Sequence, residues 1–194
     1  MKIEAIYGDL PTLETDRLLL RKVRMDDAED MFMYGSHPKV SKYTTWDRHE
    51  SIAHTKAFIQ FVLSNYANKQ PAPWGIEHKA DGTFIGTIDF GMWQLHHKSA
   101  ELGYVISQNY WGQGLATEAA REVIAFGFKK MDLVRIQARC FIENTASARV
   151  MEKLGMTYEG TLRKCWYLKE EHQDLKMYSI LKDEFFKQQH KLSP

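Results

Sequence analysis

The order of apolar patterns along this chain predicts an α/β fold. Short runs with alternating apolar residues, typical of strands, are interspersed with longer stretches in which apolar residues recur every three or four positions, typical of helices. The predicted order is β-α-α-β-β-β-α-β-α-β-β, a mixed pattern rather than the regular alternation of a doubly wound sheet. A chain of 194 residues suffices for one domain with a sizeable core, so we expect a single domain over residues 1–194.

The first third of the chain predicts one strand and two helices. Apolar residues alternate with basic ones over residues 18–23, which predicts the first strand. Residues 26–34 predict a helix with Asp26 or Asp27 near its N-cap. Residues 51–66 carry a second helical pattern, which two prolines follow.

The remaining elements follow from similar local signals. An Ala-Asp-Gly turn at residues 80–82 predicts a hairpin, and Gly155 is placed to end a helix that starts near Asn144. Strands are predicted over residues 74–77, 83–93, 99–107, 133–141, 158–168 and 176–181, and helices over residues 118–129 and 144–154.

Composition narrows the classes of function. The chain has 26 basic and 25 acidic side chains and a formal net charge of +1, whereas nucleic-acid binders usually carry a basic excess. No apolar stretch reaches the length of a membrane span, and the N-terminus has no secretory apolar region. Cys140 and Cys165 form no Cys-x-x-Cys pair, which favours buried, reduced thiols. We therefore expect a cytoplasmic protein without a nucleic-acid or membrane partner.

The most informative segment is Gln-Asn-Tyr-Trp-Gly-Gln-Gly-Leu-Ala-Thr-Glu-Ala at residues 108–119, between a predicted strand and a predicted helix. Gly112 and Gly114 have no Cβ atom, so the backbone can approach an anion closely and adopt positive φ. The free N–H groups of the following helix start, with the positive end of the helix dipole, favour a phosphate group. The segment therefore predicts a ligand that carries phosphate, although a tight turn alone would also explain two glycines.

Two familiar phosphate loops do not fit this segment. The Walker loop requires Gly-Lys-Ser or Gly-Lys-Thr, and neither tripeptide occurs in the chain. The dinucleotide fingerprint requires a third glycine where this chain has Thr117, and it belongs near the start of a βαβ unit.

The segment does resemble the acetyl-CoA loop of the GNAT family of N-acetyltransferases, Gln/Arg-x-x-Gly-x-Gly/Ala. Trp111, Gly114 and Ala116 occupy its three defined positions, and Trp111 departs from the usual Gln or Arg. This departure is similar to the RimJ/RimL branch, whose members acetylate the N-termini of ribosomal proteins and often read Tyr-Trp-Gly-x-Gly-x-Ala here. The resemblance implies a mixed, mostly antiparallel central sheet flanked by helices.

A second segment, Glu-Asn-Thr-Ala-Ser-Ala-Arg-Val-Met-Glu-Lys-Leu-Gly-Met at residues 143–156, resembles the Asn-x-x-Ser-x-x-x-x-Glu-Lys-Leu-Gly-Phe segment of the same branch. From the residues alone it is a capped amphipathic helix, and both interpretations can hold together. Residues 159–164, followed by a polar His-Gln-Asp turn, are similar to the C-terminal strands of that branch. The resemblance thus covers nearly the whole chain.

The resemblance implies acetyl-CoA as co-substrate and no metal. It implies that pantetheine lies along the strand before the glycine loop, where a free N–H near Val105 would polarise the thioester carbonyl, and that the loop N–H groups hold the pyrophosphate. The implied acetyl-CoA ligands are Val105, Ile106, Trp111, Gly112, Gln113, Gly114, Leu115, Ala116, Thr117, Asn144 and Ser147.

The implied reaction transfers an acetyl group from acetyl-CoA to an amine. We expect Glu101 to act as base through a water, because it shares a strand and a face with Val105; an ion-paired strand glutamate is the alternative. We expect Ser147 to hydrogen-bond the leaving thiolate, with Tyr104 or Tyr178 as substitutes. Asp47 and Glu50, near the start of the second predicted helix, and Asp89 are candidates for receiving a cationic substrate; the alternative is that they are solvated charges.

The acceptor is open at this stage. An N-terminal α-amine, such as that of a ribosomal protein, is the leading expectation, because it loses its proton more readily than a lysine amine. A small amine such as a polyamine or aminoglycoside, or a silent acetyl-CoA sensor, are the alternatives, and either a monomer or a homodimer fits the family. The loops over residues 35–50, 66–74 and 93–98 carry no pattern that would decide.

Overall fold

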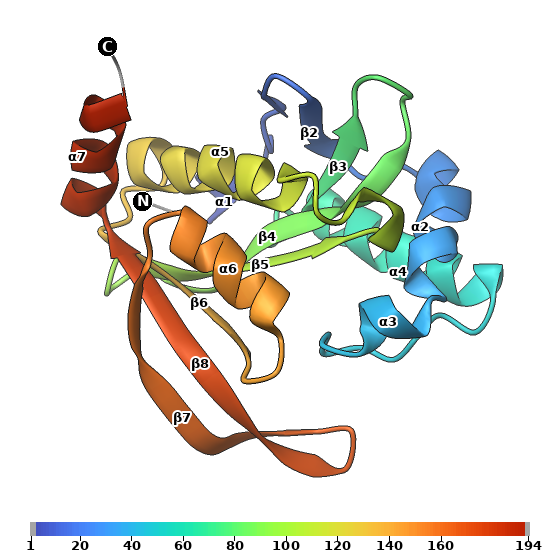
Figure 1. Cartoon of the computed structure of the whole chain (residues 1–194). Coiled ribbons are helices and arrows are strands. Elements are labelled where there is room, and N and C mark those ends of the chain that lie inside the picture. Colours follow the sequence, from blue (N-terminus) through green and yellow to red (C-terminus); the bar gives the residue numbers. More distant parts are fainter. Residues whose placement is uncertain (1–2, 193–194) are drawn as a thin grey trace.

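The structure is built on one eight-stranded sheet with helices on both faces (Figure 1). The computed structural model describes residues 3–192 of the chain, and its side chains over residues 3–188. The order of strands across the sheet is β1-β2-β3-β4-β5-β6-β8-β7, and all neighbours are antiparallel except β5 and β6. The expected mixed, mostly antiparallel α/β fold is confirmed. The strands are β1 (Leu13–Glu14), β2 (Leu18–Lys22), β3 (Trp74–His78), β4 (Phe84–Gln94), β5 (Ser99–Ile106), β6 (Arg135–Phe141), β7 (Thr157–Leu168) and β8 (Glu171–Leu181).

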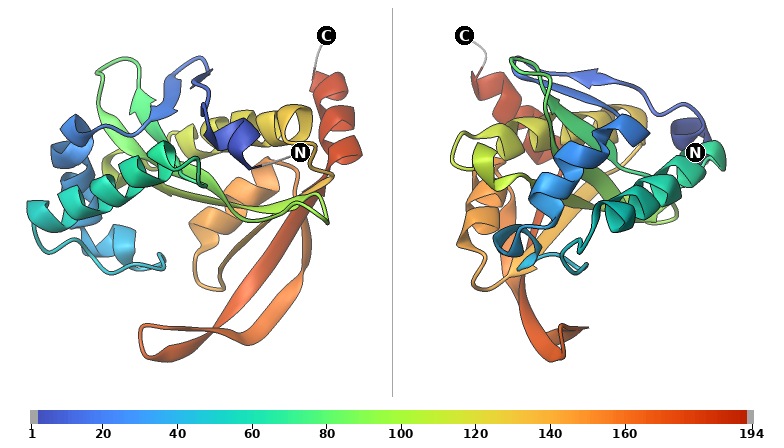
Figure 2. Two further views of the ribbon diagram at one scale, coloured as in Figure 1. Left: turned by 180° about the vertical axis from the view of Figure 1, so that it is seen from behind. Right: turned by 90° about the vertical axis from the view of Figure 1, so that its right-hand side faces the viewer.

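The helices form two layers around this sheet. Helices α5 and α6 lie on one face, and α1 and α4 lie on the opposite face (Figures 1 and 2). The helices are α1 (Glu4–Tyr7), α2 (Ala28–Gly35), α3 (Pro38–Ser41), α4 (Ile52–Ala67), α5 (Leu115–Lys130), α6 (Thr145–Lys153) and α7 (Lys182–Leu192), with 3-10 turns at η1 (Met25–Asp27) and η2 (Gln108–Tyr110).

Two apolar clusters hold the layers together. The larger one includes Val123 and Phe128 of α5, which pack with Leu102 of β5. The smaller one joins Ile59 of α4 to Phe84 of β4. Because each cluster lies against the sheet, both helical layers fix the position of the central strands β4 and β5.

Most predicted elements are confirmed to within a few residues. Asn144 is the N-cap of α6, and Gly155 follows that helix with a φ of +75°. Helix α5 begins at Leu115, three residues before the predicted start, and β8 begins five residues before its predicted start. The elements α1, β1, α3 and α7 were not predicted, because the first three are too short to show a period and α7 is largely polar.

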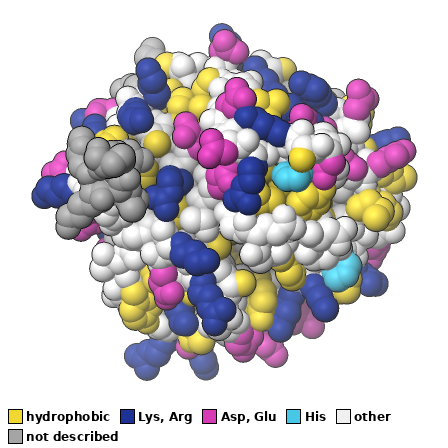
Figure 3. All heavy atoms as spheres, turned by 45° about the horizontal axis from the view of Figure 1, so that its top comes forward, with side chains coloured by type: hydrophobic (Ala, Val, Ile, Leu, Met, Phe, Trp, Pro, Cys, Tyr) yellow, Lys and Arg dark blue, Asp and Glu magenta, His cyan; other side chains and the backbone are white. Residues whose placement is uncertain are grey.

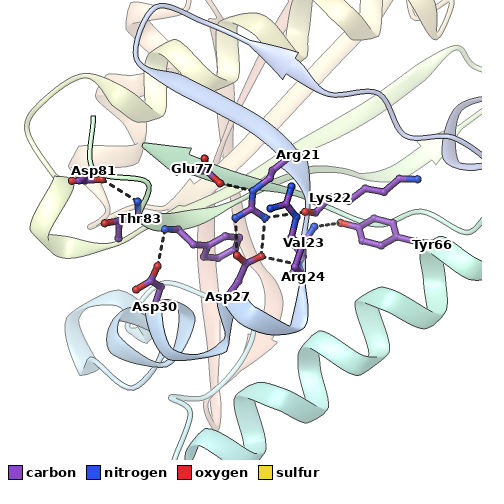
Figure 4. Close-up of polar contacts among 11 residues, drawn as sticks. Arg21, Lys22, Val23, Arg24, Asp27, Asp30, Tyr66, Glu77, Asp81 and Thr83 are labelled. Atoms are coloured by element: carbon purple, nitrogen blue, oxygen red, sulfur yellow. Dashed lines mark hydrogen bonds and ion pairs between the residues drawn. The ribbon is translucent and has the colours of Figure 1, made fainter. Parts of the chain in front are cut away.

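Asp27 is the N-cap residue of α2, as predicted, and its side chain forms a buried ion pair instead of a capping hydrogen bond to that helix. Its carboxylate receives two hydrogen bonds from the guanidinium of Arg21, at 2.9 and 2.7 Å, and one from the backbone N–H of Arg24 (Figure 4). Arg21 also bonds Glu77 of β3 at 2.6 Å. Arg21 therefore ties β2 and β3 to the turn that precedes α2.

The expectation of two buried thiols is half right. Cys140 on β6 is buried, and burial raises the pKa of its thiol to about 11. Cys165 is exposed, so that part of the prediction is wrong. The reason is its place on β7, the outermost strand, whose side chains are mostly exposed on both faces.

We predict that Asp27→Ala lowers the free energy of unfolding by about 3 kcal/mol, because it leaves a buried guanidinium with part of its partners missing. Urea denaturation measures this loss, with Asp26→Ala as the control because Asp26 is exposed on the same turn. Equal stability of the two variants would show that the buried pair contributes little.

Candidate functional site

A cleft of about 460 Å³ opens in the sheet where β5 and β6 separate. The two strands pair only over three residues, Ser99–Glu101 with Arg135–Gln137. Beyond these pairs, the edge of β5 that faces β6 has no strand partner among the described residues. The walls of the cleft come from β4, β5 and β6, from the start of α6, from α4 and the segment before it, and from β7.

The open edge of β5 presents main-chain groups to the cleft. Ser107 donates its N–H to the carbonyl of Ile85 on β4 at 2.7 Å, and hydrogen bonds alternate along an antiparallel ladder. The N–H of Val105 therefore points toward β4, whereas those of Tyr104 and Ile106 point toward the gap. The free N–H groups near Val105 are therefore those of its two neighbours along β5. The unpaired edge can accept an extended ligand as an added strand.

The glycine loop lies at one end of this edge and has the predicted conformation. Gly112 and Gly114 have φ values of +77° and +79°. The first intrahelical hydrogen bond of α5 is donated by Glu118, so the N–H groups of residues 112–117 have no backbone acceptor within residues 3–192. Leu115 itself is buried in the core beneath α5 and anchors the helix start. Free donors and a helix N-terminus together fit an anionic diphosphate.

Trp111 braces the loop. Its indole N–H donates to the carbonyl of Ile106 at 2.7 Å, and about half of the side chain is exposed. The loop is thus held against the end of β5 by the residue that departs from the usual Gln or Arg. The carbonyl of Ile106 is therefore used within the protein, and its N–H remains directed toward the gap.

Arg17, which precedes β2, contacts the glycine loop, and the sequence did not predict this contact. It donates from Nη1 to the carbonyl of Gln113 at 3.0 Å and forms an ion pair with Glu118 of α5 at 2.6 Å. Its guanidinium lies 3.8 Å from the position that a Cβ atom on Gly114 would take. No local pattern reveals this role, because about a hundred residues separate Arg17 from the loop. On the face that Figure 3 shows, basic and acidic side chains are interspersed.

A pair of hydroxyl groups lies on the α6 side of the cleft. Ser147 Oγ and the hydroxyl of Tyr104 are 2.9 Å apart, and burial raises the pKa of Tyr104 to about 12. Asn144 accepts the N–H of Ser147 with its Oδ1 at 3.1 Å, which leaves its amide nitrogen without a partner in the described structure. Tyr178 bonds Glu152 instead and does not line the cleft. Of the two tyrosines proposed as substitutes, the structure brings Tyr104 alone to Ser147.

Two carboxylates line the opposite side of the cleft, and their surroundings differ. Glu101 bonds Arg139 through Oε1 at 2.6 Å and Gln137 through Oε2 at 3.1 Å. Asp89 has no hydrogen bond or ion pair within the described residues. Burial, followed by the charge of Glu101, raises the pKa of Asp89 to about 6.

Part of the cleft lining is aromatic. Arg139 stacks on Trp166 of β7, with its guanidinium carbon 3.8 Å from the ring centroid. Asp47 and Glu50 are exposed and lie outside the cleft lining, so of the three acids expected to receive a cation only Asp89 is in place. The aromatic side chains that line the cleft are Tyr43, Trp46, Phe58, Phe61, Phe90, Tyr104, Phe141 and Trp166.

The described part of the chain has neither a metal-binding cluster nor a membrane-spanning helix. The described side chains, those of residues 3–188, include no group of three or more His, Cys, Asp and Glu arranged to hold a metal ion. No helix within residues 3–192 is both long and apolar enough to cross a membrane.

Comparison with known proteins identifies the family of this cleft and loop. The sequence pattern described as "Acetyltransferase (GNAT) domain" matches residues 17–157, which include β5, the glycine loop and α6. The chain belongs to the GNAT family of acetyltransferases. It is 38% identical over 172 residues to the uncharacterized N-acetyltransferase YoaA of Bacillus subtilis, covering 89% of this chain and 97% of YoaA.

Other relatives agree with this family. A GNAT acetyltransferase of known structure from Bacillus anthracis is 33% identical, with a TM-score of 0.80 over 90% of this chain and 100% of that one. The putative ribosomal N-acetyltransferase YdaF of Bacillus subtilis is 26% identical over 88% of this chain and 94% of its own length.

We predict that Gly114→Val raises the KM for acetyl-CoA at least tenfold, because a branched side chain would strain the positive φ and cover the free N–H groups. Steady-state kinetics measure this change. Gly160→Val is the control, since Gly160 also has positive φ but lies on the outer strand β7 with open space around it. An unchanged KM for acetyl-CoA in Gly114→Val would exclude the loop as the pyrophosphate site.

Proposed function

We propose that this GNAT-family protein transfers an acetyl group from acetyl-CoA to the N-terminal α-amine of a protein. The observation that carries the proposal is the open edge of β5, which has the glycine loop at one end and borders a cleft with a hydroxyl pair and two carboxylates. Transfer of an acetyl group to an amine needs these parts: a site for the phosphate-bearing donor, a proton acceptor and a group that stabilises the leaving thiolate.

The donor is proposed to occupy the groups that the structure leaves without partners. The N–H groups of residues 112–117 would hold the pyrophosphate, with Arg17 adding positive charge beside them. The N–H groups of Tyr104 and Ile106 and the amide nitrogen of Asn144 would bind the pantetheine arm along β5. When bound, acetyl-CoA supplies the acetyl group as a reactive thioester.

The hydroxyl pair is proposed to act on the sulfur. Ser147 would donate a hydrogen bond to the leaving thiolate, and Tyr104 would orient the serine hydroxyl from 2.9 Å away. A tyrosine whose pKa is raised to about 12 by burial stays protonated at neutral pH, so it can donate to the serine oxygen while the serine proton points at the sulfur.

The choice of an α-amine rests on the cost of removing its proton. At pH 7 an α-amine with a pKa near 8 costs about 1 kcal/mol to deprotonate, whereas a lysine amine costs about 4–5 kcal/mol. Carboxylates are modest bases, so they suit the first acceptor better. The relative YdaF, described as a putative ribosomal N-acetyltransferase, is consistent with a protein N-terminus as acceptor.

An acceptor panel tests the proposed substrate class. We expect thiol release from acetyl-CoA with peptides that have a free α-amine, and a product mass increased by one acetyl group. The matched control is the same peptide with a blocked N-terminus and a free lysine, which we expect to be a poor acceptor. Turnover confined to polyamines or aminoglycosides would replace the peptide by a small amine, and acetyl-CoA binding without any turnover would indicate a sensor.

We predict that Ser147→Ala lowers kcat about 10- to 100-fold and leaves the KM for acetyl-CoA nearly unchanged, as expected for a hydrogen bond that strengthens on charge development. The cap of α6 should survive, because Asn144 accepts from the backbone N–H of Ser147 and not from its hydroxyl. Thr145→Ala, an exposed change on the same helix turn, is the control for kinetics and for thermal stability. A wild-type kcat in Ser147→Ala would leave Ser147 as a helix residue only.

A further inference from the structure

The two carboxylates of the cleft, Glu101 and Asp89, are not equivalent. The spacing of residues along β5 favoured Glu101 as the base, but in the structure its carboxylate is already bound by other side chains. Both oxygens of Glu101 are engaged, one by the ion pair with Arg139 and the other by the amide of Gln137. Arg139 is in turn held by its stacking on Trp166. A carboxylate fixed in this way has little freedom to accept a proton from a substrate, because protonation would break the pair.

Asp89 lies beside the reaction path and has no partner. On β4 it stands directly opposite Gly103 of β5, two residue pairs away from Gly91 and Glu101 and on the same face of the sheet as Glu101. A Cβ atom on Gly103 would lie 3.0 Å from Asp89 Oδ1, so the missing side chain leaves room above β5 for this carboxylate. It is the carboxylate of the cleft that the described residues leave free to meet a substrate.

We propose that Asp89 binds the ammonium group of the acceptor and takes its proton, while the Glu101–Arg139 pair positions and tunes it. This proposal rests on the acetyl transfer proposed above. The proton passes from nitrogen to the carboxylate of Asp89, and the nitrogen lone pair forms the new bond to the acetyl carbonyl carbon. The carbon–sulfur bond breaks, and its electron pair leaves with the sulfur, which Ser147 hydrogen-bonds. The nitrogen releases its second proton as the amide forms, and this proton converts the leaving thiolate into the thiol of coenzyme A.

The groups around Asp89 favour the binding of a cation beside its carboxylate. Tyr7 of α1 and Glu101 of β5 interact with it, and neither carries positive charge. Among the residues that line the cleft, the basic side chain is Arg139 of β6, and it is paired with Glu101. The hydroxyl of Tyr7 is buried without a hydrogen-bond partner, and burial, then the charge of Asp89, raises its pKa. An ammonium group would therefore supply the positive charge that this side of the cleft lacks.

The basicity of Asp89 selects among amines. With its pKa raised to about 6, the carboxylate is ionised at neutral pH and lies about two units below an α-amine. Proton transfer from an α-amine is then unfavourable by roughly 10²-fold, and from a lysine amine by more than 10⁴-fold. The pKa of Asp89 therefore favours an α-amine over a lysine amine as the acceptor.

The test compares Asp89→Asn with Glu101→Gln in pH–rate profiles. In the wild type we expect kcat/KM to rise with pH through a limb near pH 6, since Asp89 accepts a proton only after it has lost its own. Asp89→Asn should lower kcat/KM at pH 7 about 100-fold or more and remove this limb, with acetyl-CoA affinity unchanged. Glu101→Gln should keep the limb but move it to lower pH, because a negative charge that raises the pKa of Asp89 is gone.

The opposite pattern would overturn the proposal. If Glu101→Gln removes the limb and Asp89→Asn only moves it, Glu101 is the base; if Asp89→Asn leaves the profile intact, Asp89 plays no part. Asp47→Asn, an exposed acid outside the cleft, is the control. Asp89→Asn should melt no lower than the wild type at pH 7, since burial disfavours the charged form of Asp89. If the wild type acetylates no amine, the proposed function itself is refuted. The comparison of variants tests only the role of Asp89, so the two failures can be told apart.

Discussion

The short pairing of β5 with β6 is the constraint on which the site depends. Three residue pairs join these parallel strands, and the rest of β5 faces an opening. A fully paired β5 would spend the N–H groups of Tyr104 and Ile106 on β6 and leave no edge for an added strand. The same separation places the glycine loop at one end of the opening and the N-terminus of α6 across from it. The cleft is therefore a consequence of sheet topology, and its side chains are placed on a frame that two apolar clusters hold rigid.

Successive side chains of β5 point to opposite faces of the sheet, so the groups proposed to act on the thiolate and on the amine lie on different faces. Tyr104 points to the face covered by α6, where it meets Ser147. Glu101 and Gly103 point to the opposite face, where Asp89 lies across from Gly103. Because the strands are apart at this level, groups from both faces reach the same opening. In the proposed mechanism the thiolate is stabilised from one face and the amine loses its proton on the other.

Local spacing was enough to predict the parts of the site that lie within one segment. The positive φ of Gly112 and Gly114 and the cap at Asn144 follow from residues that are neighbours in sequence. The ion pair of Glu101 with Arg139 could not be predicted this way, because 38 residues separate the two. The direction of the Val105 N–H also depended on the register between β4 and β5, which no single strand encodes.

Two poorly solvated aspartates, Asp27 and Asp89, differ in whether the fold supplies a cation to their carboxylates. Asp27 is buried with the guanidinium of Arg21, and hydrogen bonds to Asp27 and then to Glu77 raise the pKa of that arginine even against the effect of burial. Asp89 is given no such partner, and its raised pKa means that the folded state disfavours its charge at neutral pH. An asparagine of the same shape would remove that cost. A carboxylate placed in a substrate-sized cleft at the expense of stability is explained by a cationic ligand, and in the proposed mechanism the acceptor ammonium is that cation.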